Sequence, residues 1–264
     1  MGLAPFKSPV ARSVPFDNST NGMVSTDAQA AIEEVRNGLG STFSTILEQF
    51  DDFITGATTS QMGWAVNTSG GSAGATLVET APYISHLNFG VIQIKSSTAV
   101  SGRTVLYVLP CMRLGNCKVT FETNIYLDDL GGILGTDYQL HVGLCDQYNT
   151  NNDQQDGVYF EYQSTTSANW RICTASNNTR TKTTTTVPVV ADQYIKLKLI
   201  VNTAGTNVDF YINGTLAGSI TTNIPTAAGF NVGPYFRIRN TLLSTVRSAY
   251  IDYVYTRMDF GASR

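Results

Sequence analysis

Residues 194–220 are YIKLKLIVNTAGTNVDFYINGTLAGSI, and this stretch decides the fold class that the sequence predicts. In its first part, Ile195, Leu197 and Leu199 alternate with polar or charged residues. Such alternation is typical of a half-buried β-strand, because successive side chains of a strand point to opposite faces. The dipeptide Asn213-Gly214 then separates two further runs and is the strongest short signal of a tight β-hairpin. The stretch therefore predicts antiparallel strands joined by a hairpin turn at 213–214.

The same alternation recurs through the second part of the chain, in Lys118–Leu127, Tyr138–Cys145, Val158–Gln163 and Ser248–Met258. Thr179–Thr186 has high β-propensity and predicts an exposed edge strand or a hairpin arm, with Arg180 and Lys182 discouraging edge-to-edge aggregation. Many short strands with turn signals between them are typical of a β-sandwich or jelly roll. We therefore expect a mainly β protein in which residues 63–264 form an antiparallel β-sandwich.

The composition excludes several classes of function. Charged residues make up 14% of the chain, against about 25% in an average soluble domain. A net charge of −3 without a basic block disfavours nucleic-acid binding. No apolar stretch approaches the roughly 18 residues that a membrane span requires, and the N-terminus lacks the apolar core of a cleaved signal peptide. We expect synthesis in a cytoplasm, with neither nucleic acid nor membrane as a partner.

The first 62 residues differ from the rest. Residues 1–26 are rich in proline and polar side chains, which favours an extended arm. Residues 27–55 carry apolar side chains three or four positions apart, which predicts a helix, and residues 56–62 are a linker. The apolar positions of this expected helix are Ile32, Val35, Leu39, Phe43, Ile46, Phe50 and Phe53.

The apolar stripe of the expected helix needs a cover, which is either the chain's own domain or the same helix from other copies. Gly38 and Gly40 each weaken an isolated helix by about 1 kcal/mol relative to alanine. We expect self-association in a coiled coil, since the following domain looks complete without the helix. Aromatic and β-branched core positions favour a coiled coil of three helices over one of two, so the prediction is a homotrimer.

Residues 14–23 and 27–35 are VPFDNSTNGM and DAQAAIEEV. Together they resemble an element of tailed-bacteriophage virion proteins, in which a Pro-Phe-Asp-Asn-Ser-Thr-Asn-Gly leader precedes a QxAIEE helix. In that family the element occurs in tail fibres, spikes and other appended proteins, commonly trimeric, near the end that joins the particle. The resemblance implies a virion location, with attachment to other virion proteins through the leader residues Pro15, Phe16, Asp17 and Asn18.

Residues 194–201 and 208–218 resemble the concanavalin/laminin-G type of jelly roll, in which a strand ending in FYING or a similar sequence is a recurring core hairpin. This resemblance implies a fold that is often used for carbohydrate binding. A fold does not by itself establish a function, so the residues have to be considered for catalysis separately.

A glycosidase needs two carboxyl groups about 5–9 Å apart across the sugar. Laminarinase-like jelly rolls place theirs along one strand as Glu-x-Asp-x-x-Glu, and no such string occurs in this sequence. Glu122 and Glu161 are single acids at outward positions of alternating strands, which is typical of a solvated sheet face. His141 lies between two apolar residues and has no obvious neighbouring nucleophile. We expect no catalytic residue and no enzyme activity.

The loop 146–157 is the most suggestive surface segment. Its carboxylates and amides are oxygen donors that Ca²⁺ prefers, and a tyrosine in it could lie flat against a sugar, but solvated turns have the same composition. Trp170 is a second stacking candidate, with a place in the core as its alternative. The candidate glycan contacts are Asp146, Tyr148, Asn151, Asp153 and Trp170.

The chain has four cysteines, Cys111, Cys117, Cys145 and Cys173, which we expect to be free and buried. Paired Cys-x-x-Cys spacing is lacking, and the two histidines are isolated from each other. The sequence therefore predicts no zinc site, no other metal ligands and no cofactor.

These observations predict a bacteriophage virion structural protein. It would be a short trimeric fibre or spike, anchored by its N-terminus, whose lectin-like heads bind host-surface glycans with the avidity of several sites. One alternative is a capsid decoration or head-fibre protein with a mainly structural role. An alternative from another class is a polysaccharide-degrading enzyme.

Overall fold

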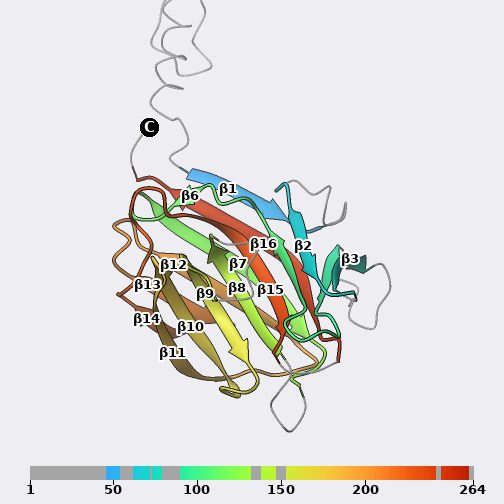
Figure 1. Ribbon diagram of the computed structural model, residues 1–264. Helices are drawn as coiled ribbons and strands as arrows, with labels where there is room; N and C mark the ends of the chain where they lie inside the picture. Colours follow the sequence, from blue (N-terminus) through green and yellow to red (C-terminus); the bar gives the residue numbers. More distant parts are fainter. Residues whose placement is uncertain are drawn as a thin grey trace, which may run out of the picture. The chain divides into compact units, whose positions relative to one another are not determined.

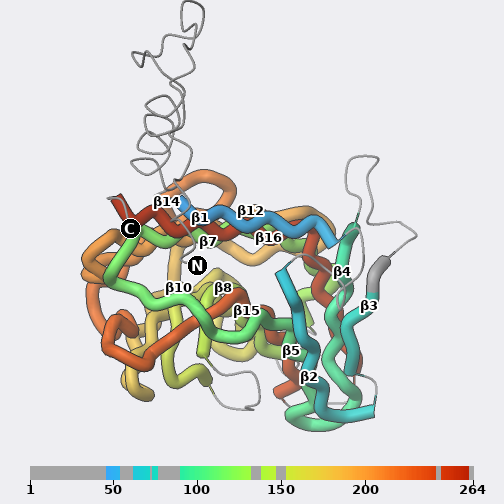
Figure 2. Tube along the Cα trace, turned by 90° about the horizontal axis from the view of Figure 1, so that it is seen from above, coloured from blue at the N-terminus to red at the C-terminus, as the bar shows by residue number. Residues whose placement is uncertain are grey.

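The alternating residues 118–127 form the long central strand β7 (Lys118–Leu127) of the first of two antiparallel sheets. The computed structural model describes residues 46–53, 62–71, 73–78, 90–131, 138–146, 153–241 and 245–261. These residues belong to one compact unit, Ile46–Gly261. Figure 1 shows the strands, and Figure 2 shows the two sheets as layers.

The first sheet has the spatial order β14 (Thr215–Ile220), β13 (Val208–Ile212), β12 (Tyr194–Val201), β7, β16 (Ser248–Asp259), β4 (Val91–Lys95) and β3 (Gly74–Val78), with β1 (Ile46–Asp51) paired to β16. The second sheet has the order β11 (Thr179–Pro188), β10 (Asn169–Ser176), β9 (Gly157–Gln163), β8 (Tyr138–Cys145), β15 (Asn231–Asn240), β5 (Arg103–Tyr107) and β2 (Ala65–Ser69), with β6 (Met112–Arg113) paired to β15. The expected antiparallel β-sandwich is confirmed.

The core lies between the two sheets and consists of the apolar members of the alternating pattern. Phe121 of β7 packs against Phe236 of β15 with ring centroids 6.1 Å apart, and Phe160 of β9 packs edge-on against Phe210 of β13 at 5.2 Å. All four rings are fully buried. Burying each such side chain stabilises the fold by roughly 1.5–3 kcal/mol, so these pairs fix the sheets against each other.

The predicted hairpin turn is confirmed. Ile212 and Thr215 are direct partners, which leaves Asn213 and Gly214 as a two-residue loop. Their φ angles are 49° at Asn213 and 81° at Gly214, both in the left-handed region. Positive φ at both positions is the requirement of a type I′ turn, and asparagine and glycine meet it most easily.

The predicted edge strand is also confirmed, since β11 is the outermost strand of the second sheet.

The helix expected over 27–55 is wrong for residues 46–51, which form β1. This strand pairs with β16 from Ile46 opposite Asp259 to Asp51 opposite Val254. Beyond its end, Phe53 is fully buried and packs against Trp64, with ring centroids 5.6 Å apart. Pairing with β16 beyond β4 forms the backbone hydrogen bonds of β1 and places Phe53 in the buried core, so tertiary packing overrides the local helical spacing.

Three of the seven residues assigned to the trimer seam, Ile46, Phe50 and Phe53, therefore belong to the sandwich of their own chain. Phe50 stacks on Tyr253 of β16, with ring centroids 5.7 Å apart. The sandwich accordingly includes residues that precede the expected boundary at 63. The seam residues Ile32, Val35, Leu39 and Phe43 and the leader residues Pro15, Phe16, Asp17 and Asn18 lie outside the described residues.

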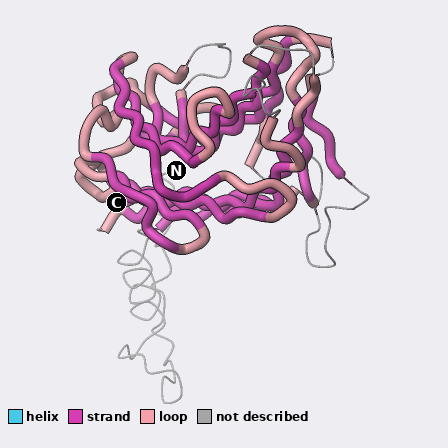
Figure 3. Tube along the Cα trace, turned by 90° about the horizontal axis from the view of Figure 1, so that it is seen from below, coloured by secondary structure: helices cyan, strands magenta, loops and turns pink. Residues whose placement is uncertain are grey.

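Figure 3 shows strands and loops, without a helix, among the described residues. Within the same ranges, the structure contains no helix with the length and hydrophobicity that a membrane span requires.

Candidate functional site

A group of charged and polar side chains lies on the outer face of the second sheet and is here called the Glu161 cluster. Its members are Gln139 and His141 of β8, Asp153, Glu161 of β9, Arg171 of β10 and Lys182 of β11. Register brings them together, because Glu161 is directly opposite both His141 and Arg171. Outward positions of three adjacent strands thus meet in one row.

Glu161 is the centre of this cluster and is completely buried. Its Oε2 atom is 3.0 Å from His141 Nε2 and 2.8 Å from Lys182 Nζ. Its Oε1 atom is 2.7 Å from Arg171 Nη1. The Lys182 ammonium also lies 2.5 Å from Asp153 Oδ2, so one cation joins two carboxylates.

The charges of the cluster are mutually stabilised. Burial by itself raises the pKa of Glu161, but the hydrogen bond with His141 and the charge of Lys182 outweigh it, and the pKa lies well below its usual range. The pKa of Asp153 is likewise lowered, because His141 and Lys182 outweigh its burial. Burial and the nearby Arg237 lower the pKa of His141 to about 4, so its imidazole is neutral at pH 7.

These protonation states limit the chemistry of the Glu161 cluster. A glycosidase acid requires a carboxyl group with a raised pKa, whereas both carboxyl groups here have lowered ones. His141, Asp153 and Glu161 could together offer three metal ligands, since one ligand atom of each lies within 4.8 Å of the others. However, the ammonium group of Lys182 already pairs with both carboxylates, in the way that a metal ion would. The arrangement is that of an internal ion network in which each carboxylate is paired with a cation.

A glycine opens space beside this network. At Gly143 of β8, an added Cβ would be 2.7 Å from the Cα and 2.9 Å from the Cβ of Tyr159, its partner on β9. The missing side chain therefore lets Tyr159 approach β8, where its ring lies 4.6 Å from that of His141. Tyr159 and His141 are both fully buried, so this part of the sheet presents no open ring to a sugar.

Several candidates from the sequence have different surroundings from those expected. Glu161 is buried rather than solvated, and Lys182 joins its cluster instead of protecting an exposed edge.

Trp170 is fully buried against Phe160 and cannot stack on a glycan, which confirms its alternative assignment to the core. Asp146 accepts a hydrogen bond from the backbone N–H of Asp156 at 3.1 Å. Tyr148 and Asn151 lie outside the described residues.

The cysteines are free, as expected. Cys117, Cys145 and Cys173 are buried, whereas the expectation of burial is wrong for Cys111, which is exposed. Burial raises the pKa of the Cys145 and Cys173 thiols well above the usual value.

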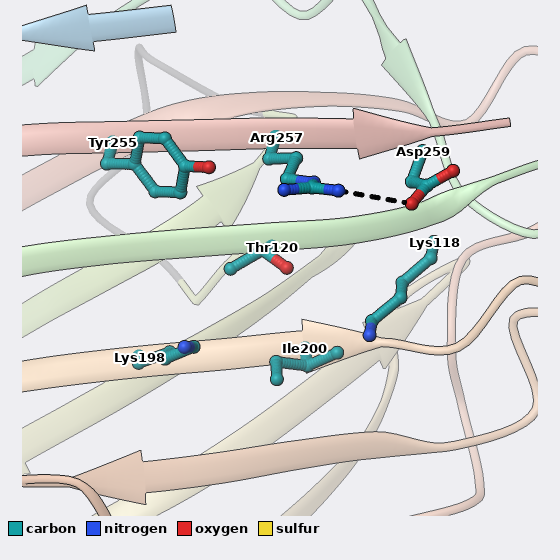
Figure 4. A pocket seen from close by; sticks show the side chains of 7 residues that line it. All are labelled: Lys118, Thr120, Lys198, Ile200, Tyr255, Arg257 and Asp259. Atoms are coloured by element: carbon teal, nitrogen blue, oxygen red, sulfur yellow. Dashed lines mark hydrogen bonds and ion pairs between the residues drawn. The ribbon is translucent and has the colours of Figure 1, made fainter. Parts of the chain in front are cut away.

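An open hollow lies on the outer face of the first sheet, and we call it the Thr120 groove. It has a volume of about 290 Å³ and is lined by Lys118, Thr120, Lys198, Ile200, Tyr255, Arg257 and Asp259, all shown in Figure 4. These residues come from three adjacent strands, β7, β12 and β16. Sequence reasoning missed the groove, because its members are separated by up to 141 positions in the chain.

The cross-strand register explains why a groove forms at this place. Thr120 is directly opposite Ile200 on one side and Arg257 on the other. Two positions along the strands, Lys198 and Tyr255 flank Glu122 in the same way. Thr120 is the shortest side chain in this array, so the longer side chains around it form the walls and it forms the floor.

More cations than anions line the groove. Three of its lining residues are cations, Lys118, Lys198 and Arg257, and one, Asp259, is an anion. Arg257 is paired with Asp259 at 3.4 Å and with Glu48 of β1 at 3.1 Å, while Lys198 is 3.7 Å from Glu122. Within the described ranges, Lys118 forms no ion pair with a carboxylate.

Comparisons with known proteins agree with this architecture. Residues 87–252 match the family model described as "SO2946-like, C-terminal domain". None of the curated proteins compared with this chain matches it.

Among solved structures, the protein of unknown function SO2946 from Shewanella oneidensis MR-1 is similar, with a TM-score of 0.59 and 16% identity over 93% of this chain and 98% of that one. The endo-1,3-beta-glucanase from Streptomyces sioyaensis has a TM-score of 0.55 and 12% identity, over 81% of this chain and 97% of that one. The endo-beta-1,4-glucuronan lyase from the fungus Trichoderma reesei has a TM-score of 0.54 and 10% identity, with the same coverage. At these identities the likeness shows a shared β-sandwich fold.

Proposed function

This chain belongs to the family of SO2946-like C-terminal domains, and from this premise we propose that its sandwich binds carbohydrate without cleaving it. The Thr120 groove is the observation that carries the proposal. It is an open hollow lined by a hydroxyl group, a tyrosine ring and charged side chains. Sugar sites combine an apolar surface with a few placed polar groups, and Ile200 with Tyr255 supplies the former.

The absence of cleavage is proposed from the state of the acids. Glu161 and Asp153 are joined by Lys182 and both have lowered pKa values, so neither holds a proton to donate at neutral pH. In the Thr120 groove the lining carboxyl group is Asp259, which is paired with Arg257. A lone paired carboxylate does not supply the acid and nucleophile of glycoside hydrolysis.

The sequence of the leader supports a bacteriophage virion as the setting of this binding activity. The arm with Pro15, Phe16, Asp17 and Asn18 would attach the chain to other virion proteins, and the sandwich would face the host surface. The homotrimer stays a prediction and now depends on Ile32, Val35, Leu39 and Phe43. Several weak sites on one particle would raise avidity by about 10² to 10⁴ over a single site.

Affinity electrophoresis of the full chain through gels that contain polysaccharide tests the proposed binding. The gels hold a β-1,3-glucan, a β-1,4-glucuronan or dextran, and an unrelated protein of similar charge is the control. We expect at least one polysaccharide to retard the chain relative to the control. Migration unaffected by every polysaccharide would count against binding. Release of shorter oligosaccharides during incubation would show that the chain is an enzyme.

The virion setting is tested on purified particles. An antibody against the chain should detect it in intact particles, and separated tails and DNA-filled heads then distinguish a tail fibre or spike from a capsid decoration protein. Particles that lack the chain would overturn the virion assignment while leaving carbohydrate binding to be judged by electrophoresis.

A further inference from the structure

We propose that the Thr120 groove selects an acidic saccharide and seats the anionic group of one sugar unit over Thr120. This inference rests on the proposed carbohydrate binding and adds the class of ligand. The anionic group is a carboxylate, a sulfate or a phosphate, since all three offer oxygen acceptors to the same cations.

Three cations surround Thr120 on the outer face of the first sheet. Arg257 is directly opposite Thr120 on β16, Lys118 is two positions before Thr120 on β7, and Lys198 is the diagonal neighbour on β12. Neighbouring strands lie about 4.8 Å apart, and two positions along a strand span about 6.7 Å. Each cation is thus one step from Thr120, within the reach of a flexible side chain. Figure 4 shows Lys118 extending from β7 toward β12.

The charge of the groove lining differs in sign from that of the whole chain. The whole chain has a net charge of −3, yet three cations and one anion line this groove. Asp259 and Glu48 both bind Arg257, and Glu122 lies 3.7 Å from Lys198, whereas Lys118 forms no ion pair with another described residue. Lys118 therefore supplies a positive charge that no described carboxylate offsets, which favours an anion in the groove and disfavours a further cation.

The size and walls of the groove suit a sugar unit. A volume of about 290 Å³ is near the lower end of the roughly 300–1,000 Å³ typical of small-molecule sites, so a short part of a polymer fits. Ile200 and Tyr255 stand on opposite sides of β7 and offer apolar surface to a sugar ring. A free phosphate ion would use the cations and leave these two walls without contact.

The test compares two trisaccharides that differ in their acidic groups, a β-1,4-linked glucuronic acid trimer and a β-1,4-linked glucose trimer. Binding to the full chain is measured by calorimetry at low salt and at 0.15 M salt, where surface charges are screened within about 8 Å. We expect the acidic trimer to bind at least about tenfold more tightly than the neutral one and to weaken with salt. A sulfated glucose trimer and inorganic phosphate are additional probes that separate a saccharide requirement from simple anion binding.

The variants are Lys118→Ala and Lys198→Ala, with Lys196→Ala as the matched control. Lys196 and Lys198 share strand, face and the partner Glu122, but Lys198 lines the groove and Lys196 does not. Each groove variant should weaken binding of the acidic trimer by about threefold to tenfold, and the control by less than about twofold. All three side chains are solvent-exposed or partly exposed, and equal unfolding temperatures would verify intact folding.

The outcomes separate this inference from the proposed function. If a neutral glucan retards the chain in electrophoresis and acidic trimers bind no better than neutral ones, the inference is wrong while carbohydrate binding stands. Acidic trimers that bind unchanged to both groove variants also overturn it, as does phosphate binding as tight as that of the acidic trimer. Failure of every polysaccharide to bind overturns the proposed function and the inference together.

Discussion

Asp51 accepts a hydrogen bond from the indole N–H of Trp64, with Oδ2 and Nε1 3.0 Å apart. The same carboxylate accepts the backbone N–H of Phe53 at 2.9 Å and that of Met62 at 3.3 Å. Asp51 is 4% exposed, so all three donors are satisfied away from water. One side chain thereby joins the end of β1 to the segment that leads into β2.

Replacing this carboxylate should destabilise the sandwich. Asp51→Ala leaves buried N–H donors of Phe53 and Trp64 without an acceptor, and each such donor costs about 1–3 kcal/mol. We expect a loss of about 2–4 kcal/mol in the free energy of unfolding, measured by urea denaturation. Asp51→Asn keeps one acceptor and should lose less. An alanine variant as stable as the original would show that these bonds contribute little.

Truncation should separate the sandwich from the arm. A chain that begins at residue 46 retains β1 and Phe53, so its unfolding transition should match that of the full chain. A chain that begins at residue 59 lacks Phe53, whose loss from the core alone costs about 3–5 kcal/mol. Thermal unfolding of both chains measures the difference, and equal stability would mean that β1 is dispensable.

The masses in solution of the full chain and of the chain that begins at residue 46 test the trimer. If Ile32, Val35, Leu39 and Phe43 form its seam, the chain that begins at residue 46 should be a monomer by light scattering while the full chain is a trimer. A trimer that survives the truncation would move the contacts into the sandwich, and a monomeric full chain would remove the prediction of a trimer.

The Glu161 cluster should show strong coupling between its members. Glu161→Leu leaves Lys182 with one carboxylate fewer in a buried site, and breaking a buried pair from one side costs about 3–5 kcal/mol. Adding Lys182→Met removes part of the uncompensated charge, so the double variant should lose less stability than the sum of the two single variants. Strict additivity in urea denaturation would contradict the ion network.

Stability should fall as the pH drops from about 6.5 to about 4. The pKa of His141 is lowered to about 4 in the folded chain by burial, against 6.5 for an ordinary histidine. Between these values the unfolded chain binds a proton that the folded chain does not, which lowers the free energy of unfolding by something on the order of 3 kcal/mol. His141→Gln should flatten the pH dependence of stability in this window, and an unchanged slope would contradict the neutral, buried imidazole.

Below about pH 4.5 the carboxylates should dominate. Because the pKa values of Glu161 and Asp153 are lowered, their stabilisation is present above the ordinary pKa values of 4.5 and 3.8 and is lost as the pH falls further. In the His141→Gln variant part of this second loss should remain, because Lys182 still lowers both pKa values, and this separates it from the histidine effect.

One cysteine should react quickly in the folded chain. Cys111 is exposed, whereas burial raises the pKa of Cys145 and Cys173 and so suppresses their thiolates. A thiol reagent should label one site rapidly, and Cys111→Ser should abolish the rapid phase. Two or more rapidly labelled sites would mean that the sandwich opens on the time scale of labelling.

The sequence alone determined the sandwich. The alternation around Leu197 and Phe121 and the turn at Asn213-Gly214 act through local rules, because side-chain direction along a strand and positive φ at a turn depend on neighbouring residues. The same local reasoning correctly left Trp170 with a place in the core as an alternative to the surface.

Only the tertiary structure decided the rest. The spacing of Ile46, Phe50 and Phe53 is helical, but the segment forms a strand because it pairs with β16, which lies more than 190 residues away in the chain. The Glu161 cluster and the Thr120 groove depend on the register of adjacent strands, which sets Glu161 beside His141 and Thr120 beside Arg257. Register is a relation between distant segments, and so a local pattern does not contain it.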